Sequence, residues 1–236
     1  MIGNPLLDEF LALDDDQRAD PARRDELIAR YAFAIPDDTA LDLIVDLSPS
    51  GVVELAAGTG YWARLLHERS ASVRAYDLHP PSTPTNKWFA TSEPWFEVEA
   101  ADETVVDHAP PATLLLVWPT RNETWASTAI ERFHDAGGTT IVYVGEGPGG
   151  RTGDDGFHAA LGELTECTQC RYGALDAPCI CDIPVRWRRC AEHAIPTWPG
   201  FHDALRVYER LDAPVARDGR RARRRGLMRR ARRARG

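Results

Sequence analysis

The chain has 236 residues, of which 43% are hydrophobic, and this length fits one α/β domain that buries a core without disulfides. The formal net charge of −8 divides into +10 over residues 217–236 and −18 over the rest. An acidic body of this kind repels nucleic acid and anionic membranes over most of its surface, so only the C-terminal segment is able to attract them.

No apolar run reaches the roughly 20 residues of a membrane-spanning helix, and the first residues lack the basic and apolar stretches of a signal peptide. We therefore expect a cytoplasmic protein with no membrane partner. Its five cysteines are then expected to be thiols or metal ligands rather than disulfides.

Hydrophobic periodicity predicts helices first and then alternating strands and helices. Helical patterns cover residues 5–34, 39–47, 61–70, 124–135 and 157–165. Strand patterns cover residues 51–55, 72–76, 96–100, 113–118, 139–144, 186–195 and 204–209. Strands that alternate with helices imply βαβ units and a mostly parallel sheet.

Three parts of the chain differ in composition. We predict an N-terminal helical cap over residues 1–48 and an α/β domain over residues 49–212, with a cysteine-rich insertion at 167–190. Residues 213–236 have the low complexity of a disordered tail rich in arginine.

A glycine-rich turn connects the first predicted strand to the next helix. Gly58 and Gly60 suit a tight turn that a ligand approaches closely, at a helix N-terminus that favours anionic groups. The letters GTGYWA also fit the dinucleotide pattern G-x-G-x-x-A, and Asp77 lies nineteen residues after Gly58, where such proteins carry a ribose-binding acid. A turn that binds nothing is the remaining structural interpretation.

The segment VVELAAGTGYWARLL (52–66) resembles the first motif of class I S-adenosylmethionine-dependent methyltransferases. Glu54 holds the position of the acid that ends the first strand in that family, and Ala56 stands where its first glycine is usual. The resemblance implies that Glu54, Ala56, Gly58, Gly60 and Tyr61 border the methionine part of the cofactor.

The same resemblance extends over roughly residues 51–209. It implies a Rossmann-like, seven-stranded, mostly parallel sheet whose last strand is antiparallel. It places Asp77 on the ribose hydroxyls and Asp102 near the adenine amino group. The stretches LLLVWP, VYVGEG and IPTWPGFHDALRVYER are similar to a group of methyltransferase-like proteins for which no acceptor is established.

Two residues after later strands are candidates for the acceptor side, since ligands of open α/β sheets lie beyond the carboxyl ends of the strands. Trp118 follows the fourth strand and is expected to stack on substrate or adenine, although a core tryptophan explains it equally well. Glu146 follows the fifth strand and is a candidate catalytic base, with a solvated acidic loop as the alternative.

The cysteines of the insertion have metal-ligand spacing. Cys167, Cys170, Cys179 and Cys181 form a C-x2-C and a C-x-C pair, which together offer four thiolates to a structural zinc ion. Buried free thiols are the alternative.

These patterns favour S-adenosylmethionine-dependent methyl transfer to an unidentified acceptor, expected to be a small molecule. One alternative is an NAD(P)-dependent oxidoreductase, although a Tyr-x-x-x-Lys pair is absent because Thr83 lies four residues before Lys87, the sole lysine. Another is a non-catalytic binding module with a zinc loop. The arginine-rich tail lacks aromatic residues for base stacking, so we expect at most electrostatic nucleic-acid binding there.

Overall fold

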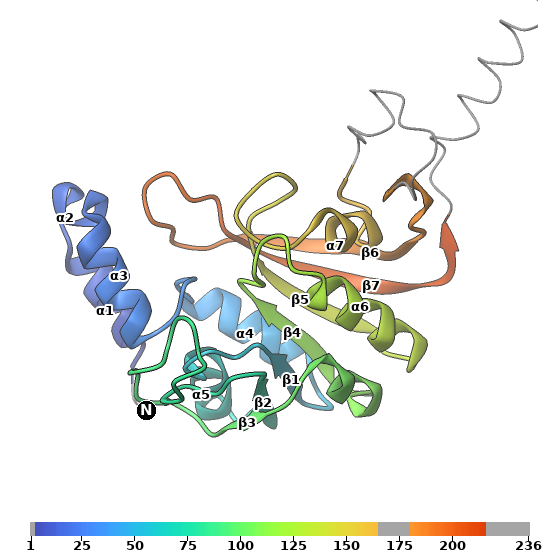
Figure 1. The fold of residues 1–236 in the computed structure, drawn as a ribbon, viewed down its shortest axis with the longest axis horizontal. Coiled ribbons are helices and arrows are strands. Elements are labelled where there is room, and N and C mark those ends of the chain that lie inside the picture. Colours follow the sequence, from blue (N-terminus) through green and yellow to red (C-terminus); the bar gives the residue numbers. More distant parts are fainter. Residues whose placement is uncertain (1–2, 165–179, 216–236) are drawn as a thin grey trace, which may run out of the picture.

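A computed structural model describes residues 3–164 and 180–215 and contains a seven-stranded sheet (Figure 1). The strand order is β3-β2-β1-β4-β5-β7-β6. Strands β1 to β5 pair in parallel, whereas β7 is antiparallel to both β5 and β6. The strands are β1 (Val52–Leu55), β2 (Val73–Asp77), β3 (Val98–Ala100), β4 (Thr113–Val117), β5 (Thr140–Gly145), β6 (Val185–Ala194) and β7 (Ala204–Val215). The predicted fold class is thereby confirmed.

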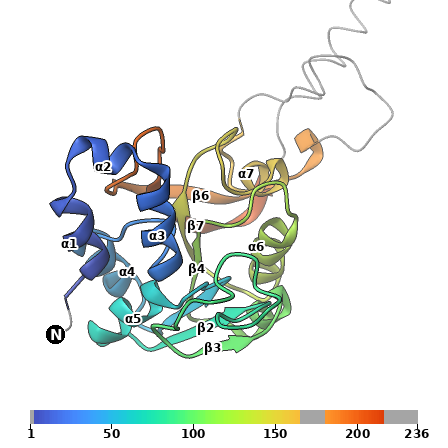
Figure 2. The ribbon, with the colours of Figure 1, turned by 60° about the vertical axis from the view of Figure 1, so that its left-hand side comes forward.

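Helices cover both faces of the sheet, with α4 and α5 on one side and α6 and α7 on the other (Figure 2). The helices are α1 (Pro5–Ala12), α2 (Asp15–Ala19), α3 (Pro21–Arg30), α4 (Asp38–Leu47), α5 (Tyr61–Glu68), α6 (Trp125–Asp135) and α7 (Asp155–Ala160), with 3-10 turns η1 (Glu103–His108) and η2 (Ile180–Asp182). Strand β4 lies between two such helical layers, and Leu114, Leu115 and Leu116 are fully buried. This explains its continuous apolar sequence, since a strand buried on both faces does not alternate.

The N-terminal helices share a core with the sheet. Leu6 of α1 and Leu27 of α3 belong to the same buried cluster as Leu115 of β4. The Tyr61 hydroxyl accepts a hydrogen bond from the backbone N–H of Leu6 (3.0 Å) and donates one to Asn4 (2.8 Å). Residues 3–48 are thus packed against the α/β unit, and the division of residues 1–48 as a separate domain stays a prediction.

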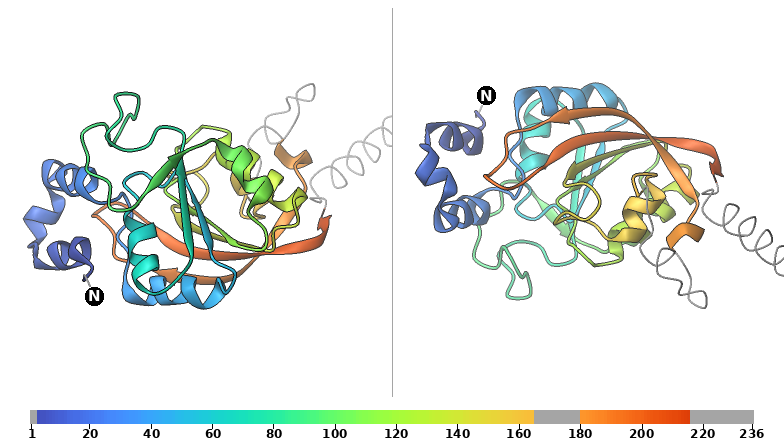
Figure 3. Two further views of the ribbon diagram at one scale, coloured as in Figure 1. Left: turned by 90° about the horizontal axis from the view of Figure 1, so that it is seen from below. Right: turned by 90° about the horizontal axis from the view of Figure 1, so that it is seen from above.

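The long connection between β2 and β3, residues 78–97, lies beside the N-terminal helices (Figure 3). The indole N–H of Trp95 donates to the carbonyl of Arg30 (2.7 Å), and the Ser92 hydroxyl donates to the carbonyl of Ala29 (2.6 Å). These contacts hold the connection near the carboxyl ends of the parallel strands, where it contributes to a cavity.

Two predicted features fall largely outside the described residues. They are the cysteine-rich segment at Cys167, Cys170 and Cys179, and the arginine-rich tail from residue 216. Within residues 3–164 and 180–215, no helix combines the length and apolar character needed to cross a membrane.

Candidate functional site

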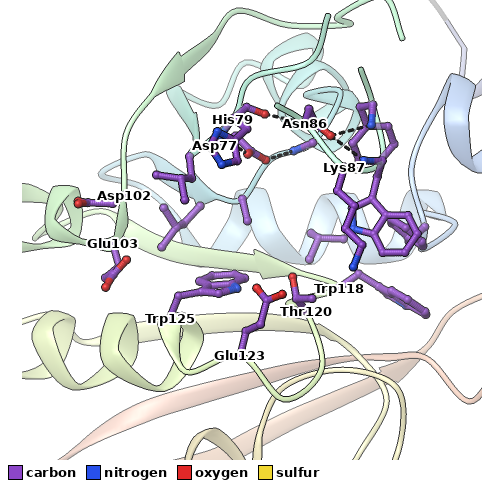
Figure 4. A pocket seen from close by; sticks show the side chains of 18 of the residues that line it. Asp77, His79, Asn86, Lys87, Asp102, Glu103, Trp118, Thr120, Glu123 and Trp125 are labelled. Atoms are coloured by element: carbon purple, nitrogen blue, oxygen red, sulfur yellow. Dashed lines mark hydrogen bonds between the residues drawn. The ribbon is translucent and has the colours of Figure 1, made fainter. Parts of the chain in front are cut away.

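A cavity of about 710 Å³ opens at the carboxyl ends of β1, β2 and β4 (Figure 4). The predicted site residues that line it are Ala56, Gly58, Asp77, Asp102 and Trp118. The volume lies within the range of about 300–1,000 Å³ typical of small-molecule sites. The register explains why these residues meet, because Leu55 of β1 pairs with both Tyr76 of β2 and Leu116 of β4.

Two residues of the cavity wall adopt left-handed backbone conformations that glycine normally occupies. Ala56 has φ 57° and Trp118 has φ 54°, and they directly follow the ends of β1 and β4. Strained conformations at non-glycine residues cluster at functional sites, because packing elsewhere must compensate for their energy. The two outliers on neighbouring strands therefore support a functional role for this end of the sheet.

The two glycines of the turn have different surroundings. A Cβ atom on Gly58 would lie 2.7 Å from the Phe89 ring, and one on Gly60 would lie 2.9 Å from the Cβ of Phe96. Both residues also have positive φ, 57° and 74°. Gly58 lines the cavity, whereas Gly60 forms the N-cap of α5 and packs against the connection before β3.

Asp77 ends β2 and is held by backbone groups. Its carboxylate accepts hydrogen bonds from the N–H of Gly58 (3.0 Å) and the N–H of His79 (2.9 Å), one on each oxygen. Burial raises the pKa of the Asp77 carboxyl above its ordinary value, and these bonds oppose the shift. A carboxylate offers about four acceptor positions, so both oxygens retain capacity for ligand hydroxyl groups.

Asp102 lies two residues after the end of β3, the strand that pairs with β2, and just before η1. Its carboxylate caps that turn by accepting from the N–H (2.9 Å) and hydroxyl (2.6 Å) of Thr104. These bonds hold the pKa of the Asp102 carboxyl below its usual range. The group is therefore a fixed negative charge at one end of the cavity.

Glu54 lies beneath the glycine turn and not in the main cavity. Burial raises the pKa of its carboxyl to about 8, while a hydrogen bond from the Ala63 N–H near the start of α5 opposes that shift. Its Oε2 atom is buried without a hydrogen-bond partner. Glu54 borders a chamber of about 30 Å³ that also touches Phe33, Phe89 and Trp118.

Aromatic side chains that the sequence interpretation did not select form much of the cavity wall. Phe33 stacks on Trp118 with ring centroids 4.6 Å apart and packs edge-on against Trp88 (5.5 Å) and Phe89 (5.9 Å). Trp125, the first residue of α6, lines the opposite side. The dipeptide Trp88-Phe89 within a polar, proline-rich connection was an available signal, whereas Phe33 had none.

Two further predicted site residues, Tyr61 and Glu146, also lie outside the main cavity. The Tyr61 side chain is buried against α1, where its hydroxyl is hydrogen bonded. Glu146 is 3% exposed, so it is not on a solvated loop. Its oxygens accept from the Arg151 N–H (2.6 Å), the Arg151 guanidinium (2.8 Å) and the His202 N–H (3.0 Å). This arrangement favours a role in fixing the two loops.

The zinc prediction rests on residues that the structure mostly does not describe. Of its four cysteines only Cys181 lies in a described element, η2. Among the described residues, no group of three or more His, Cys, Asp or Glu side chains is arranged to hold a metal ion. The cysteine site stays a prediction.

The order of the strands and the antiparallel insertion of β7 between β5 and β6 decide the fold family. The chain has the fold of class I methyltransferases. In this methyltransferase fold the cavity occupies the crevice at the carboxyl ends of the parallel strands, where open α/β sheets bind ligands. The predicted Ala56, Gly58, Asp77, Asp102 and Trp118 all meet there.

Several solved structures are similar to this chain at low identity. A Synechocystis magnesium protoporphyrin IX methyltransferase with bound SAM is 10% identical (88% of this chain, 97% of that chain, TM-score 0.43). A Burkholderia thailandensis 1,6-didemethyltoxoflavin-N1-methyltransferase with bound S-adenosylhomocysteine is 15% identical (75% and 80%, TM-score 0.43). A putative tRNA (m1A22) methyltransferase of Streptococcus pneumoniae is 9% identical (78% and 76%, TM-score 0.41). No protein-family model and no curated protein matches the chain.

Proposed function

We propose that this protein transfers a methyl group from S-adenosylmethionine to a small-molecule acceptor. The supporting observation is that Asp77, Asp102 and the backbone of the Ala56–Gly58 turn line one cavity at the ends of β1, β2 and β3. Two carboxylates beside a glycine turn suit a ligand that presents hydroxyl and amino donors as well as a positive charge.

The residues present fit the nucleoside part of this cofactor. Asp77 retains acceptor positions on both oxygens and would bind the ribose hydroxyls. Asp102 would accept from the adenine amino group, and Trp125 offers an aromatic ring at the same end of the cavity (Figure 4).

The methionine part fits the turn only after a side-chain rearrangement. The chamber beside Glu54 measures about 30 Å³, which is room for about one water molecule. The rings of Phe33 and Phe89 border both this chamber and the main cavity. We therefore propose that one of these rings moves when the cofactor binds.

Glu54 is suited to respond to that ligand. Glu54 borders the chamber and its Oε2 has no hydrogen-bond partner. The raised pKa of its carboxyl, about 8, leaves it mostly protonated at neutral pH. An ammonium group placed nearby would favour the charged form and lower that pKa. Binding is then expected to release a proton and to tighten as the pH rises toward 8.

The cofactor, when bound, supplies an electrophilic methyl group for in-line displacement. The chain contributes by positioning the acceptor and excluding water, and positioning alone can supply a large part of the acceleration. Glu146 has its oxygens engaged by Arg151 and His202. Its proposed part is therefore to hold the loops beside Trp118, and not to accept a proton.

A cavity of about 710 Å³ in a chain whose first 216 residues carry a net charge of −18 favours a small acceptor over RNA. Among the similar structures, one is named for 1,6-didemethyltoxoflavin and another for tRNA.

Calorimetry with S-adenosylmethionine, S-adenosylhomocysteine and NAD(H) tests the proposal. We expect S-adenosylhomocysteine to bind and NAD(H) not to bind. Asp77→Asn should weaken S-adenosylhomocysteine binding at least about tenfold, the size of one charge-assisted hydrogen bond, whereas Asp212→Asn at an exposed position of β7 should not. Preferential NAD(H) binding would support an oxidoreductase, and binding of none of these ligands a non-catalytic module.

A further inference from the structure

The two ends of the cavity carry different charge. Asp102 and Glu103 lie at the end beside η1, where the proposed function places adenine. Lys87 and Arg121 line the cavity from the connections that follow β2 and β4. Under the proposed function, adenine is the partner of the acidic end, but no part of the cofactor is assigned to Lys87 and Arg121.

Neither Lys87 nor Arg121 forms an ion pair within 4 Å with a carboxylate among the residues that the structure describes. Many arginines of these regions are paired, as Arg64 is with Glu68 and Arg132 with Asp107. Arg151, which also lines the cavity, is paired with Glu146. In a chain with an excess of acids, two unpaired cations at a cavity leave room for an anionic ligand.

The position of Lys87 is set by its neighbour. The Asn86 side chain accepts from the N–H groups of Trp88 (2.9 Å) and Phe89 (2.6 Å) and donates to the carbonyl of His79. Lys87 therefore extends from a fixed backbone, and Figure 4 shows it reaching across the cavity toward Trp118 and Thr120. Its ammonium group lies 4.8 Å from the centre of the Trp88 ring.

The cavity that both cations line also has aromatic side chains in its wall. Trp88 is 53% exposed at the cavity, although large apolar side chains are usually covered. Phe33 and Trp118 form a stacked pair beside it. Glu123 is the carboxylate nearest along the chain to Arg121 and also lines the cavity. A ligand with a planar aromatic ring suits these walls. Its anionic substituent would lie near Lys87, because Glu123 would repel it.

We propose that Lys87 and Arg121 bind a carboxylate or phosphate group on an aromatic small-molecule acceptor, whose ring packs against Trp88 and the Phe33–Trp118 pair. That this molecule is the methyl acceptor rests on the proposed function, whereas the anion-binding site itself is assigned from these residues. The fit to a cavity of limited volume distinguishes such a molecule from a polyanion such as RNA.

The test uses calorimetry on the full chain, with and without saturating S-adenosylhomocysteine. The probes are 4-hydroxybenzoate, phenyl phosphate and the uncharged 4-hydroxybenzamide. The variants are Lys87→Gln and Arg121→Gln, with Arg74→Gln as the matched control, because Arg74 is an exposed cation of β2 outside the cavity.

We expect at least one anionic probe to bind, and the better of the two identifies the group. Lys87→Gln and Arg121→Gln should each weaken it about tenfold, as expected for losing one charged hydrogen bond. Arg74→Gln should leave it unchanged, and the amide should bind more weakly and without response to either substitution. The S-adenosylhomocysteine affinity should be unaffected in all three variants.

Three results would overturn the inference. The first is that neither anionic probe binds, and the second is that 4-hydroxybenzamide binds as tightly as the anionic probes. The third is that a short single-stranded RNA binds through Lys87 while the three aromatic probes do not. Failure of the proposed function is recognised separately, because it would appear as no S-adenosylhomocysteine binding in the unmodified chain, whatever the anionic probes do.

Discussion

The indole N–H of Trp118 donates a hydrogen bond to the carboxylate of Asp203, 2.8 Å away, across 85 positions of sequence. Trp118 also stacks on Phe33 and has a positive φ of 54°. The bond therefore fixes a strained tryptophan that forms one wall of the cavity. Burial raises the pKa of the Asp203 carboxyl to about 6, and the bond from Trp118 opposes the shift.

Replacement of Asp203 tests how that wall is held. Asp203→Ala leaves the indole N–H without its acceptor and should lower the free energy of unfolding by about 1 kcal/mol or more. Asp203→Asn retains an acceptor oxygen and should stay close to the unmodified protein. Urea denaturation at pH 5, below the pKa of about 6 of the folded Asp203 carboxyl, measures the effect of the hydrogen bond while most of that carboxyl is uncharged. Equal stability of the two variants would show that the bond does not matter.

Glu54 should make stability depend on pH. Its pKa is about 8 in the folded chain and about 4.3 in an unfolded one. A raised pKa means that the stabilising contribution is complete below the unfolded value and is lost as the pH rises through about 8. Glu54→Gln keeps an acceptor for Ala63 without the charge. At pH 9 its free energy of unfolding should exceed that of the unmodified protein by on the order of 5 kcal/mol.

The difference in free energy of unfolding should shrink toward pH 5, because Glu54 is then uncharged in the folded chain and partly protonated in the unfolded one. Chemical denaturation of both proteins from pH 5 to 9 measures it, and Glu99→Gln at an exposed position of β3 is the control. A Glu54→Gln difference that stays constant with pH would contradict the assignment.

Ala56→Gly tests the strain of the turn. Alanine at φ 57° carries a left-handed penalty of about 1–2 kcal/mol, while glycine loses about 0.5–1 kcal/mol more conformational entropy on folding. The variant should therefore be more stable by roughly 0.5–1 kcal/mol. Ala57→Gly, one residue on and without a positive φ, should instead be destabilised. Thermal unfolding of both variants measures the contrast, and a loss of stability in both would exclude strain at Ala56.

Gly58→Ala separates backbone strain from contact with Phe89. The new Cβ would lie 2.7 Å from the Phe89 ring at φ 57°, so strain and overpacking together should lower stability by about 2–4 kcal/mol. Gly149→Ala has a positive φ but open space around its Cβ and should lose only about 1 kcal/mol. Phe89→Leu should partly restore Gly58→Ala. Similar losses in the two alanine variants would argue against the contact.

The predicted zinc site is tested on the purified full chain. Metal analysis after dialysis should find about one equivalent of zinc if Cys167, Cys170, Cys179 and Cys181 bind it. Exchange of Cys167 and Cys170 for serine should abolish it, and exchange of Cys190 to serine should not. Less than about half an equivalent in the unmodified chain would reject a structural site.

The sequence alone determined the fold class and most of the elements. Strand β4 is identifiable because burial on both faces requires apolar residues throughout, and α4 is identifiable because Asp37 caps it. The turn at Gly58 and the acid at Asp77 were recognisable because local backbone geometry restricts which residues fit there.

Tertiary structure decided which side chains form the cavity and which only support it. Glu54 and Glu146 looked alike in sequence as acids near the ends of strands, yet both are buried and neither lines the main cavity. Phe33 and Lys87 line the cavity from distant segments, and Asp203, just before β7, supports it through its hydrogen bond with Trp118. Such convergence depends on contacts between residues far apart in the chain, and local patterns of hydrophobicity and turn residues carry no information about it.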